Sequence, residues 1–130
     1  MARRILIVDD EPDIRDLARA VLEGEGHTVA TVDDGHAALL WLAAESCDLV
    51  LLDIHMPGMG GWETLRLIRA DDELRDLPVA MFSIKGEIRD KVHALQEGAT
   101  DYIEKPFVIA VFVERIGRLL GPAEIGGHGR

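Results

Sequence analysis

Five polar residues of types that do chemistry follow apolar stretches of this sequence. Asp9 and Asp10 follow the first stretch, Asp53 the third and Ser83 the fourth, and Lys105 stands just beyond the fifth. Taken singly, each type is common in turns or at helix starts. Together they are hard to explain structurally, because three carboxylates repel one another and the fold gains nothing by gathering them beside a lysine and a serine. The set therefore indicates a functional site.

The residue types of this set suggest phosphoryl chemistry. Clustered carboxylates are best reconciled by a hard divalent cation, and Mg²⁺ usually takes one or two carboxylates, several waters and a phosphate oxygen. A carboxylate can also be the nucleophile that accepts a phosphoryl group as an aspartyl phosphate. The metal ion, the Lys105 ammonium and the Ser83 hydroxyl would then neutralise the phosphoryl oxygens or donate hydrogen bonds to them.

Apolar stretches and segments of helical spacing alternate along the chain, five of each. We expect strands at residues 5–8, 28–32, 49–52, 79–82 and 102–103. We expect helices at about residues 12–24, 35–45, 62–70, 88–97 and 108–120, with Pro12 in the first turn of the first and Asp34 capping the second. Near-continuous apolar strands that alternate with helices predict an α/β fold with a parallel sheet covered on both faces. Ligands of such sheets bind outside the carboxyl ends of the strands, where the five polar residues would converge.

Length and composition predict one compact domain. The chain has 130 residues, of which 48% are hydrophobic and 29% are charged, so its core needs neither disulfides nor a structural metal. The single cysteine, Cys47, cannot form an internal bridge. Lys and Arg number 14 against 24 Asp and Glu, which gives a formal charge of -10. We therefore expect no direct binding to nucleic acid.

The apolar runs are all far shorter than the roughly 20 residues that span a bilayer. Residues 1–4 lead into only four apolar residues before Asp9, which is too short a run for a targeting segment. We therefore expect a soluble, cytoplasmic protein without a membrane partner. Residues 121–130 include four glycines and no apolar periodicity, so we expect a flexible tail after a domain of residues 1–120.

Three stretches and one serine together resemble a known family. The stretches are ILIVDDE at 5–11, LLDIHMPGMGG at 51–61 and GATDYIEKPF at 98–107, and the serine is Ser83. In this order they resemble the receiver domain of two-component response regulators, over residues 3 to about 120. The resemblance implies a flavodoxin-like, doubly wound parallel sheet of strand order 2-1-3-4-5 with five helices.

The resemblance also implies a function and a role for each site residue. Asp53 would accept a phosphoryl group from the phosphohistidine of a histidine kinase or a histidine phosphotransfer protein. Asp10 and Asp53 would hold Mg²⁺ through their side chains, with Asp9 assisting through a water molecule and the backbone carbonyl of His55 as a further ligand. Lys105 would pair with the phosphoryl oxygens. Such a domain is a signalling module and not an enzyme, since it would catalyse only its own phosphorylation and dephosphorylation.

A conformational switch belongs to the same resemblance. On phosphorylation Ser83 would move to bond a phosphoryl oxygen, and Tyr102 would swing inward into the space that it frees. The face made by the fourth helix, the fifth strand and the fifth helix would then change and bind a downstream protein. The resemblance further implies a cis peptide bond between Lys105 and Pro106.

The sequence departs from the family's pattern beside the site. A small residue usually follows the serine, whereas here Ile84 and then Lys85 follow Ser83. We hypothesise that Ile84 restricts access of water to Asp53 and so slows hydrolysis of the phosphoryl group. The side chain of His55 could also modulate the attacking water.

The residues of the fifth helix and its neighbourhood match a phosphorylation-dependent homodimer only in part. Asp101 and Arg115 match one salt bridge that joins two activated receivers in transcription factors of this family, but Val111 and Gly117 stand where that pattern has charged partners. One surface pair is too weak to carry a dimer. Val108 and Val111 could instead offer apolar area to a partner or to a second copy.

Two other functions remain open from the sequence. One is a Mg²⁺-dependent phosphohydrolase with an aspartyl-phosphate intermediate, although such enzymes generally carry a second carboxylate where this chain has His55. The other is a binding module on the same fold that works without phosphorylation.

Overall fold

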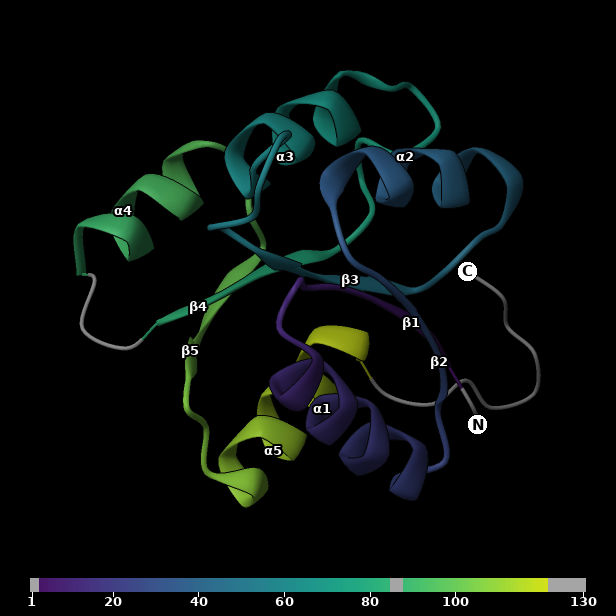
Figure 1. Cartoon of the computed structure of the whole chain (residues 1–130), viewed down its shortest axis with the longest axis vertical. Coiled ribbons are helices and arrows are strands. Elements are labelled where there is room, and N and C mark those ends of the chain that lie inside the picture. Colours follow the sequence, from purple (N-terminus) through teal and green to yellow (C-terminus); the bar gives the residue numbers. More distant parts are fainter. Residues whose placement is uncertain (1–2, 85–87, 122–130) are drawn as a thin grey trace.

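A single parallel sheet forms the centre of the computed structural model, which describes residues 3–84 and 88–121 (Figure 1). Within these residues the sheet has five strands in the order β2-β1-β3-β4-β5. They are β1 (Arg4–Val8), β2 (Thr28–Val32), β3 (Leu49–Asp53), β4 (Val79–Ile84) and β5 (Asp101–Lys105). The predicted α/β class and strand order are confirmed.

Helices cover both faces of the sheet (Figure 1). The described residues form α1 (Pro12–Gly24), α2 (Gly35–Ala44), α3 (Gly61–Ala70), α4 (Ile88–Gln96) and α5 (Ile109–Leu120). Figure 1 shows α1 and α5 together on one face, and α2, α3 and α4 on the other. Each connection returns the chain to the same edge of the sheet, so the carboxyl ends of all the strands lie together.

Local sequence explains where the first two helices begin. Pro12 occupies the start of α1, where its missing N–H costs no hydrogen bond. The Asp34 side chain caps α2 by accepting a hydrogen bond from the Ala37 N–H at 2.7 Å. Both features were predicted from the sequence.

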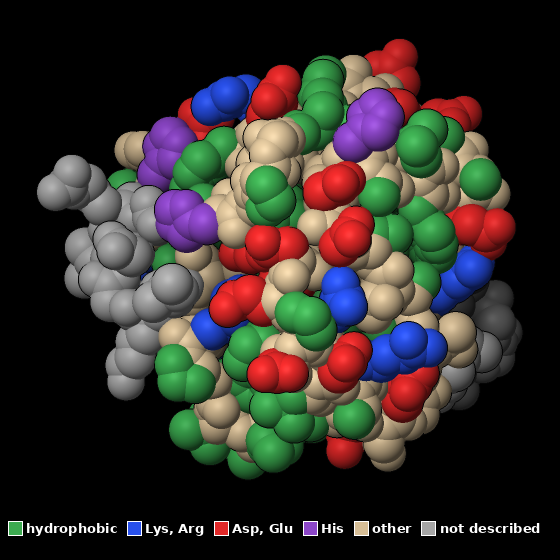
Figure 2. Space-filling view, viewed as in Figure 1, with side chains coloured by type: hydrophobic (Ala, Val, Ile, Leu, Met, Phe, Trp, Pro, Cys, Tyr) green, Lys and Arg blue, Asp and Glu red, His purple; other side chains and the backbone are tan. Residues whose placement is uncertain are grey.

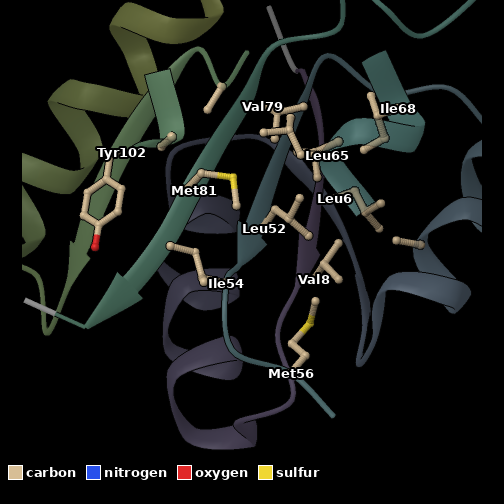
Figure 3. Close-up of a cluster of buried hydrophobic side chains, with 14 of the residues drawn as sticks. Leu6, Val8, Leu52, Ile54, Met56, Leu65, Ile68, Val79, Met81 and Tyr102 are labelled. Carbon is tan, nitrogen blue, oxygen red and sulfur yellow. The ribbon is translucent and has the colours of Figure 1, made fainter. Parts of the chain in front are cut away.

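The core has two layers because alternate strand residues point to opposite faces. Leu6, Val8 and Leu52 belong to a cluster that packs against α2, α3 and α4, part of which Figure 3 shows. Ile5 and Leu51 belong to the opposite cluster, against α1 and α5. Both sets are fully buried, which explains why the sequence of β1 and β3 is apolar without alternation.

The strand predictions were short at the carboxyl ends. β3 includes Asp53, β4 continues to Ile84, and β5 runs from Asp101 to Lys105 instead of covering residues 102–103 alone. Backbone pairing continues past the apolar residues: Ser83 of β4, for example, pairs with Glu104 of β5. The hydrogen bonds between strands join backbone groups, so they do not depend on the polarity of the side chains. Asp53, Ser83 and Lys105 are therefore held in place by the sheet itself, while Asp9 and Asp10 follow directly after β1.

Two further predictions concern membrane-spanning segments and the end of the chain. In the part of the chain that the structure describes, no helix has the length and apolar character needed to cross a membrane. The predicted flexible tail lies outside the described residues, apart from Gly121.

Candidate functional site

Three carboxylates meet at the carboxyl ends of β1 and β3. The register that pairs Val8 with Leu52 places Asp9 and Asp10 beside Asp53. One carboxylate oxygen from each of these three aspartates lies within 4.8 Å of the others. Asp9 and Asp53 are buried, with only 3% of Asp53 exposed, while Asp10 is partly exposed. The sequence therefore predicted correctly that these residues come together.

Lys105 completes this cluster from the end of β5. Its ammonium nitrogen, Nζ, donates hydrogen bonds to Asp9 Oδ2 at 2.9 Å and to Glu11 Oε1 at 3.1 Å, and it lies 3.7 Å from Asp53 Oδ1. The side chain is almost fully buried, and Nζ lies 5.0 Å from the centre of the Phe82 ring. A buried cation thus stands among three carboxylates, which compensate its loss of hydration. The peptide bond from Lys105 to Pro106 is cis, as the resemblance implies.

Glu11 belongs to this cluster although no separate role was predicted for it. It follows Asp10 directly, so the run of three acids was visible, but its bond to a lysine 94 residues away was not. Its backbone N–H also donates to Asp9 Oδ1 at 2.9 Å. Glu11 therefore links the end of β1 to the lysine of β5.

Asp53 is the carboxylate of this cluster whose pKa is raised. Burial raises the pKa of Asp53 to about 7, with Asp9 adding to the rise and Lys105 opposing it. Burial alone would lower the pKa of Lys105, but its bond to Asp9 and the nearby Asp53 carboxylate raise it, so the ammonium stays charged. The cluster carries more negative than positive charge, and a cation would favour the ionised form of Asp53.

The loop after Asp53 is held close to it. The His55 N–H donates to Asp53 Oδ1 at 3.2 Å, while the His55 side chain is exposed. Gly61, the first residue of α3, donates its N–H to the Ile54 carbonyl at 3.0 Å. A Cβ atom at Gly61 would collide with the carbonyl oxygen of Asp53. Glycine is therefore needed for α3 to begin this close to the end of β3.

The two residues predicted to switch are both buried. Ser83 Oγ is fully buried and has no hydrogen-bond partner among the described residues. The Tyr102 ring lies in the core cluster on the side of α2, α3 and α4, beside Met81 of β4, and only 2% of Tyr102 is exposed (Figure 3). The inward position that was expected only after phosphorylation is the position of Tyr102 in this structure.

The residues predicted to control access are only partly visible. Ile84 ends β4, but its side chain and all of Lys85 lie outside the described residues. Their predicted effect on the site stays a prediction.

The predicted dimer residues lie on α5 and beside it. Arg115 makes its hydrogen bonds within the chain, to Asp101 Oδ1 at 2.7 Å, to Asp101 Oδ2 at 3.2 Å and to the Tyr102 carbonyl at 2.8 Å. Val108 is 68% exposed and Val111 50%. Figure 2 shows hydrophobic side chains gathered over the start of α5, at the lower left. Both valines are therefore exposed, and they border a groove of about 420 Å³.

The comparisons with known proteins agree with this geometry. The family model described as "Response regulator receiver domain" matches residues 5–117, and the chain belongs to this family. The receiver domain of the sensor histidine kinase PA1611 from Pseudomonas aeruginosa, solved with a magnesium ion coordinated in its active-site cleft, is 30% identical with a TM-score of 0.85. The match covers 94% of this chain and 100% of that one. This family consists of signalling domains, which favours the receiver prediction over the phosphohydrolase hypothesis.

Curated relatives extend beyond the matched domain. The chain is 40% identical over 116 residues to the DNA-binding response regulator MtrA of Mycolicibacterium smegmatis, a match that covers 89% of this chain and 50% of that protein. It is also 40% identical to the phosphate regulon transcriptional regulatory protein PhoB of Escherichia coli, with 89% and 51% covered. The chain thus spans about half the length of these relatives.

These relatives correct one prediction about partners. The negative charge led us to expect no direct contact with nucleic acid, and this expectation is wrong, because relatives at 40% identity are named DNA-binding regulators. The net charge of -10 belongs to a domain that matches only half of such a protein. Charge is an argument about the surface that carries it, and it says nothing about a surface elsewhere.

Proposed function

We propose that Asp53 accepts a phosphoryl group from the phosphohistidine of a histidine kinase or a histidine phosphotransfer protein. The observation that carries this proposal is the position of the Lys105 ammonium, 3.7 Å from Asp53 Oδ1 at the buried carboxyl edge of the sheet. A lysine so placed neutralises charge beside Asp53, which is what a phosphoryl group bound there would need.

The transfer would be an in-line displacement at phosphorus. A carboxylate oxygen of Asp53 forms the new bond to phosphorus while the bond from phosphorus to the histidine nitrogen breaks. The imidazole leaves with the bonding electron pair, and the product is an acyl phosphate on Asp53. Hydrolysis by water would later return the carboxylate and inorganic phosphate. During both transfer and hydrolysis, Lys105 would balance the charge of the phosphoryl oxygens, and the Ser83 hydroxyl would donate a hydrogen bond to one of them.

The residues present fit a magnesium ion. Oxygen atoms of Asp9, Asp10 and Asp53 lie within 4.8 Å of one another, and Mg²⁺ prefers hard oxygen ligands of this kind. Asp10 and Asp53 would hold it through their side chains, with Asp9 acting through water and the His55 carbonyl as a further ligand. The magnesium ion coordinated in the active-site cleft of the PA1611 receiver supports a magnesium site in this chain. When bound, the ion would supply positive charge to the phosphoryl oxygens.

The signal would leave through α4, β5 and α5. The Ser83 hydroxyl, unpartnered among the described residues, is free to bond a phosphoryl oxygen, and Tyr102 would be held inward when it does so. A downstream protein would bind the changed face. We place the domain in the cytoplasm, where such kinases would phosphorylate it.

Intact mass spectrometry tests this proposal. We would incubate the protein with acetyl phosphate, with and without Mg²⁺, alongside Asp53→Asn and the exposed control Asp72→Asn. The expected result is a Mg²⁺-dependent adduct of one phosphoryl group on the wild type and on Asp72→Asn, and none on Asp53→Asn. An adduct that persists in Asp53→Asn, or no adduct on the wild type while another receiver is modified, would refute the assignment.

A further inference from the structure

Glu11 has an unusual position for a residue at the start of a helix. It is the N-cap residue of α1, yet its side chain accepts no capping hydrogen bond there. It reaches instead to Lys105, where Oε1 lies 3.1 Å from Nζ. The Glu11 carboxylate therefore faces the cluster at the carboxyl edge of the sheet and not the first N–H groups of α1.

The hydrogen bonds of Lys105 leave little for a phosphoryl group. An ammonium group has three donors, and two of them are used by Asp9 and Glu11. Asp53 Oδ1 lies at 3.7 Å, beyond hydrogen-bond distance. Nζ therefore lies toward the β1 side of the cluster with one donor left, and pairing with a phosphoryl group on Asp53 through a second donor would require it to give up a partner.

Of the two partners, Glu11 is the one that can be exchanged. Asp9 is completely buried, and removing its cation would leave an unpaired charge in the interior. The Glu11 side chain is 59% exposed, so water can replace the lysine at low cost. The bond at 3.1 Å is also longer than the bond to Asp9 at 2.9 Å.

We propose that Glu11 is a positioning residue that keeps the Lys105 ammonium just beyond hydrogen-bond distance of Asp53 and releases it when a phosphoryl group arrives. This inference rests on the proposed phosphorylation of Asp53. Its consequence is that Glu11 limits the rate at which the site accepts a phosphoryl group. Removing the contact leaves Lys105 bonded to Asp9 and free to turn its other donors toward Asp53.

Three variants separate the contact from its charge. Glu11→Asp keeps the charge but shortens the side chain by one methylene, so the carboxylate no longer reaches Nζ. Glu11→Gln keeps the length but loses the charge. Asp13→Asn is the matched control, because Asp13 is an exposed acid in the first turn of the same helix and makes no ion pair among the described residues.

The first measurement is the initial rate of adduct formation with acetyl phosphate and Mg²⁺. In this reaction the phosphorus–oxygen bond to acetate breaks as the bond to Asp53 forms, and acetate leaves with the electron pair. We expect both Glu11 variants to react about threefold faster than the wild type, and Asp13→Asn to react at the wild-type rate. A wild-type rate for Glu11→Asp, or an equal acceleration in Asp13→Asn, would mean that only charge at the mouth of the site matters and would overturn the proposal.

The second measurement needs neither metal ion nor phosphodonor. The side-chain ammonium resonance of Lys105 in the metal-free protein, assigned with Lys105→Arg, should shift in both Glu11 variants and stay unchanged in Asp13→Asn. An unchanged resonance in Glu11→Asp would overturn the contact itself. If the wild type forms no adduct, the proposed function fails and this inference falls with it. If the wild type is modified and the Glu11 variants behave identically to it, only this inference fails.

Discussion

At the scale of the residue, Asp53 is a carboxylate whose ionised form is destabilised by the fold. It is buried beside Asp9, and burial raises its pKa to about 7 although Lys105 stands close by. Ionising Asp53 is costly only in the folded state, because the unfolded chain exposes the carboxylate to water. Without a bound cation, the ionised Asp53 therefore lowers the free energy of unfolding of the domain.

Replacing the Asp53 carboxylate by an amide should stabilise the metal-free domain. The folded pKa of about 7 lies above the unfolded value of 3.8, so the folded state binds more protons between these limits and loses stability as the pH rises through them. We expect Asp53→Asn to raise the free energy of unfolding at pH 8 by on the order of 2 kcal/mol, and by much less at pH 4. Urea unfolding at the two pH values measures the difference.

The exposed Asp72→Asn variant is the control for this measurement. It removes the same charge from the surface and should change stability little at either pH. A benefit of Asp53→Asn that is equal at pH 4 and pH 8 would contradict the account of Asp53.

Ile84 gives a second prediction at the residue scale. If its side chain shields Asp53 from water, Ile84→Ala should lose the phosphoryl group about threefold faster than the wild type. The decay of the adduct mass after removal of the phosphodonor measures this rate. Leu40→Ala, a truncation of an exposed residue on α2, is the control. Equal decay in the wild type and Ile84→Ala would exclude shielding by this residue.

At the scale of the element, α3 connects the site to α4. Its first residue, Gly61, touches the end of β3, and three further residues along it contact α4 and the turn that follows. Trp62 packs edge-on against His93, Arg66 pairs with Glu97, and Arg69 donates to the Gly98 carbonyl. These positions follow helical spacing and therefore lie on one side of α3.

A methyl group at Gly61 should disturb the end of β3. Its Cβ would collide with the backbone carbonyl of Asp53, which has no room to move without shifting the loop. We expect Gly61→Ala to lower the free energy of unfolding by about 2 kcal/mol and to slow formation of the phosphoryl adduct. Chemical denaturation and intact mass measure the two effects.

Gly117→Ala in α5 is the matched control for this substitution. Nothing lies within 4 Å of a Cβ atom there, so the exchange should stabilise the helix by about 0.5–1 kcal/mol. A neutral Gly61→Ala would show that the contact with Asp53 is looser than the structure indicates.

The elements were predictable because each carries its own signal. The apolar runs of β1 and β3 and the capping of α2 by Asp34 are local features, and both appear in the structure where expected. The bond between Glu11 and Lys105 joins residues 94 positions apart, so its existence depends on tertiary distances that no local pattern carries. The buried position of Tyr102 likewise depends on how the ring packs against β4.

At the scale of the whole molecule, the parallel register determines where chemistry can occur. Every strand delivers its carboxyl end to one edge, and the chain places acids there from β1 and β3 and a lysine from β5. At the other end of the sheet Arg3 donates to the Leu120 carbonyl at 2.7 Å, which joins the start of β1 to the end of α5. The prediction about nucleic acid failed at this scale, because the net charge of this chain says nothing about the half of its DNA-binding relatives that it does not match.

Locating the phosphoryl group on the chain tests most directly whether Asp53 is the phosphoacceptor. Borohydride reduces the carbonyl of an acyl phosphate and releases phosphate, so a phosphorylated aspartate becomes homoserine. After treatment with acetyl phosphate and Mg²⁺ and then borohydride, peptide mass spectrometry should find homoserine at position 53 and at no other aspartate. Homoserine at position 9 or 10, or an adduct that yields none, would contradict the assignment of Asp53 as the phosphoacceptor.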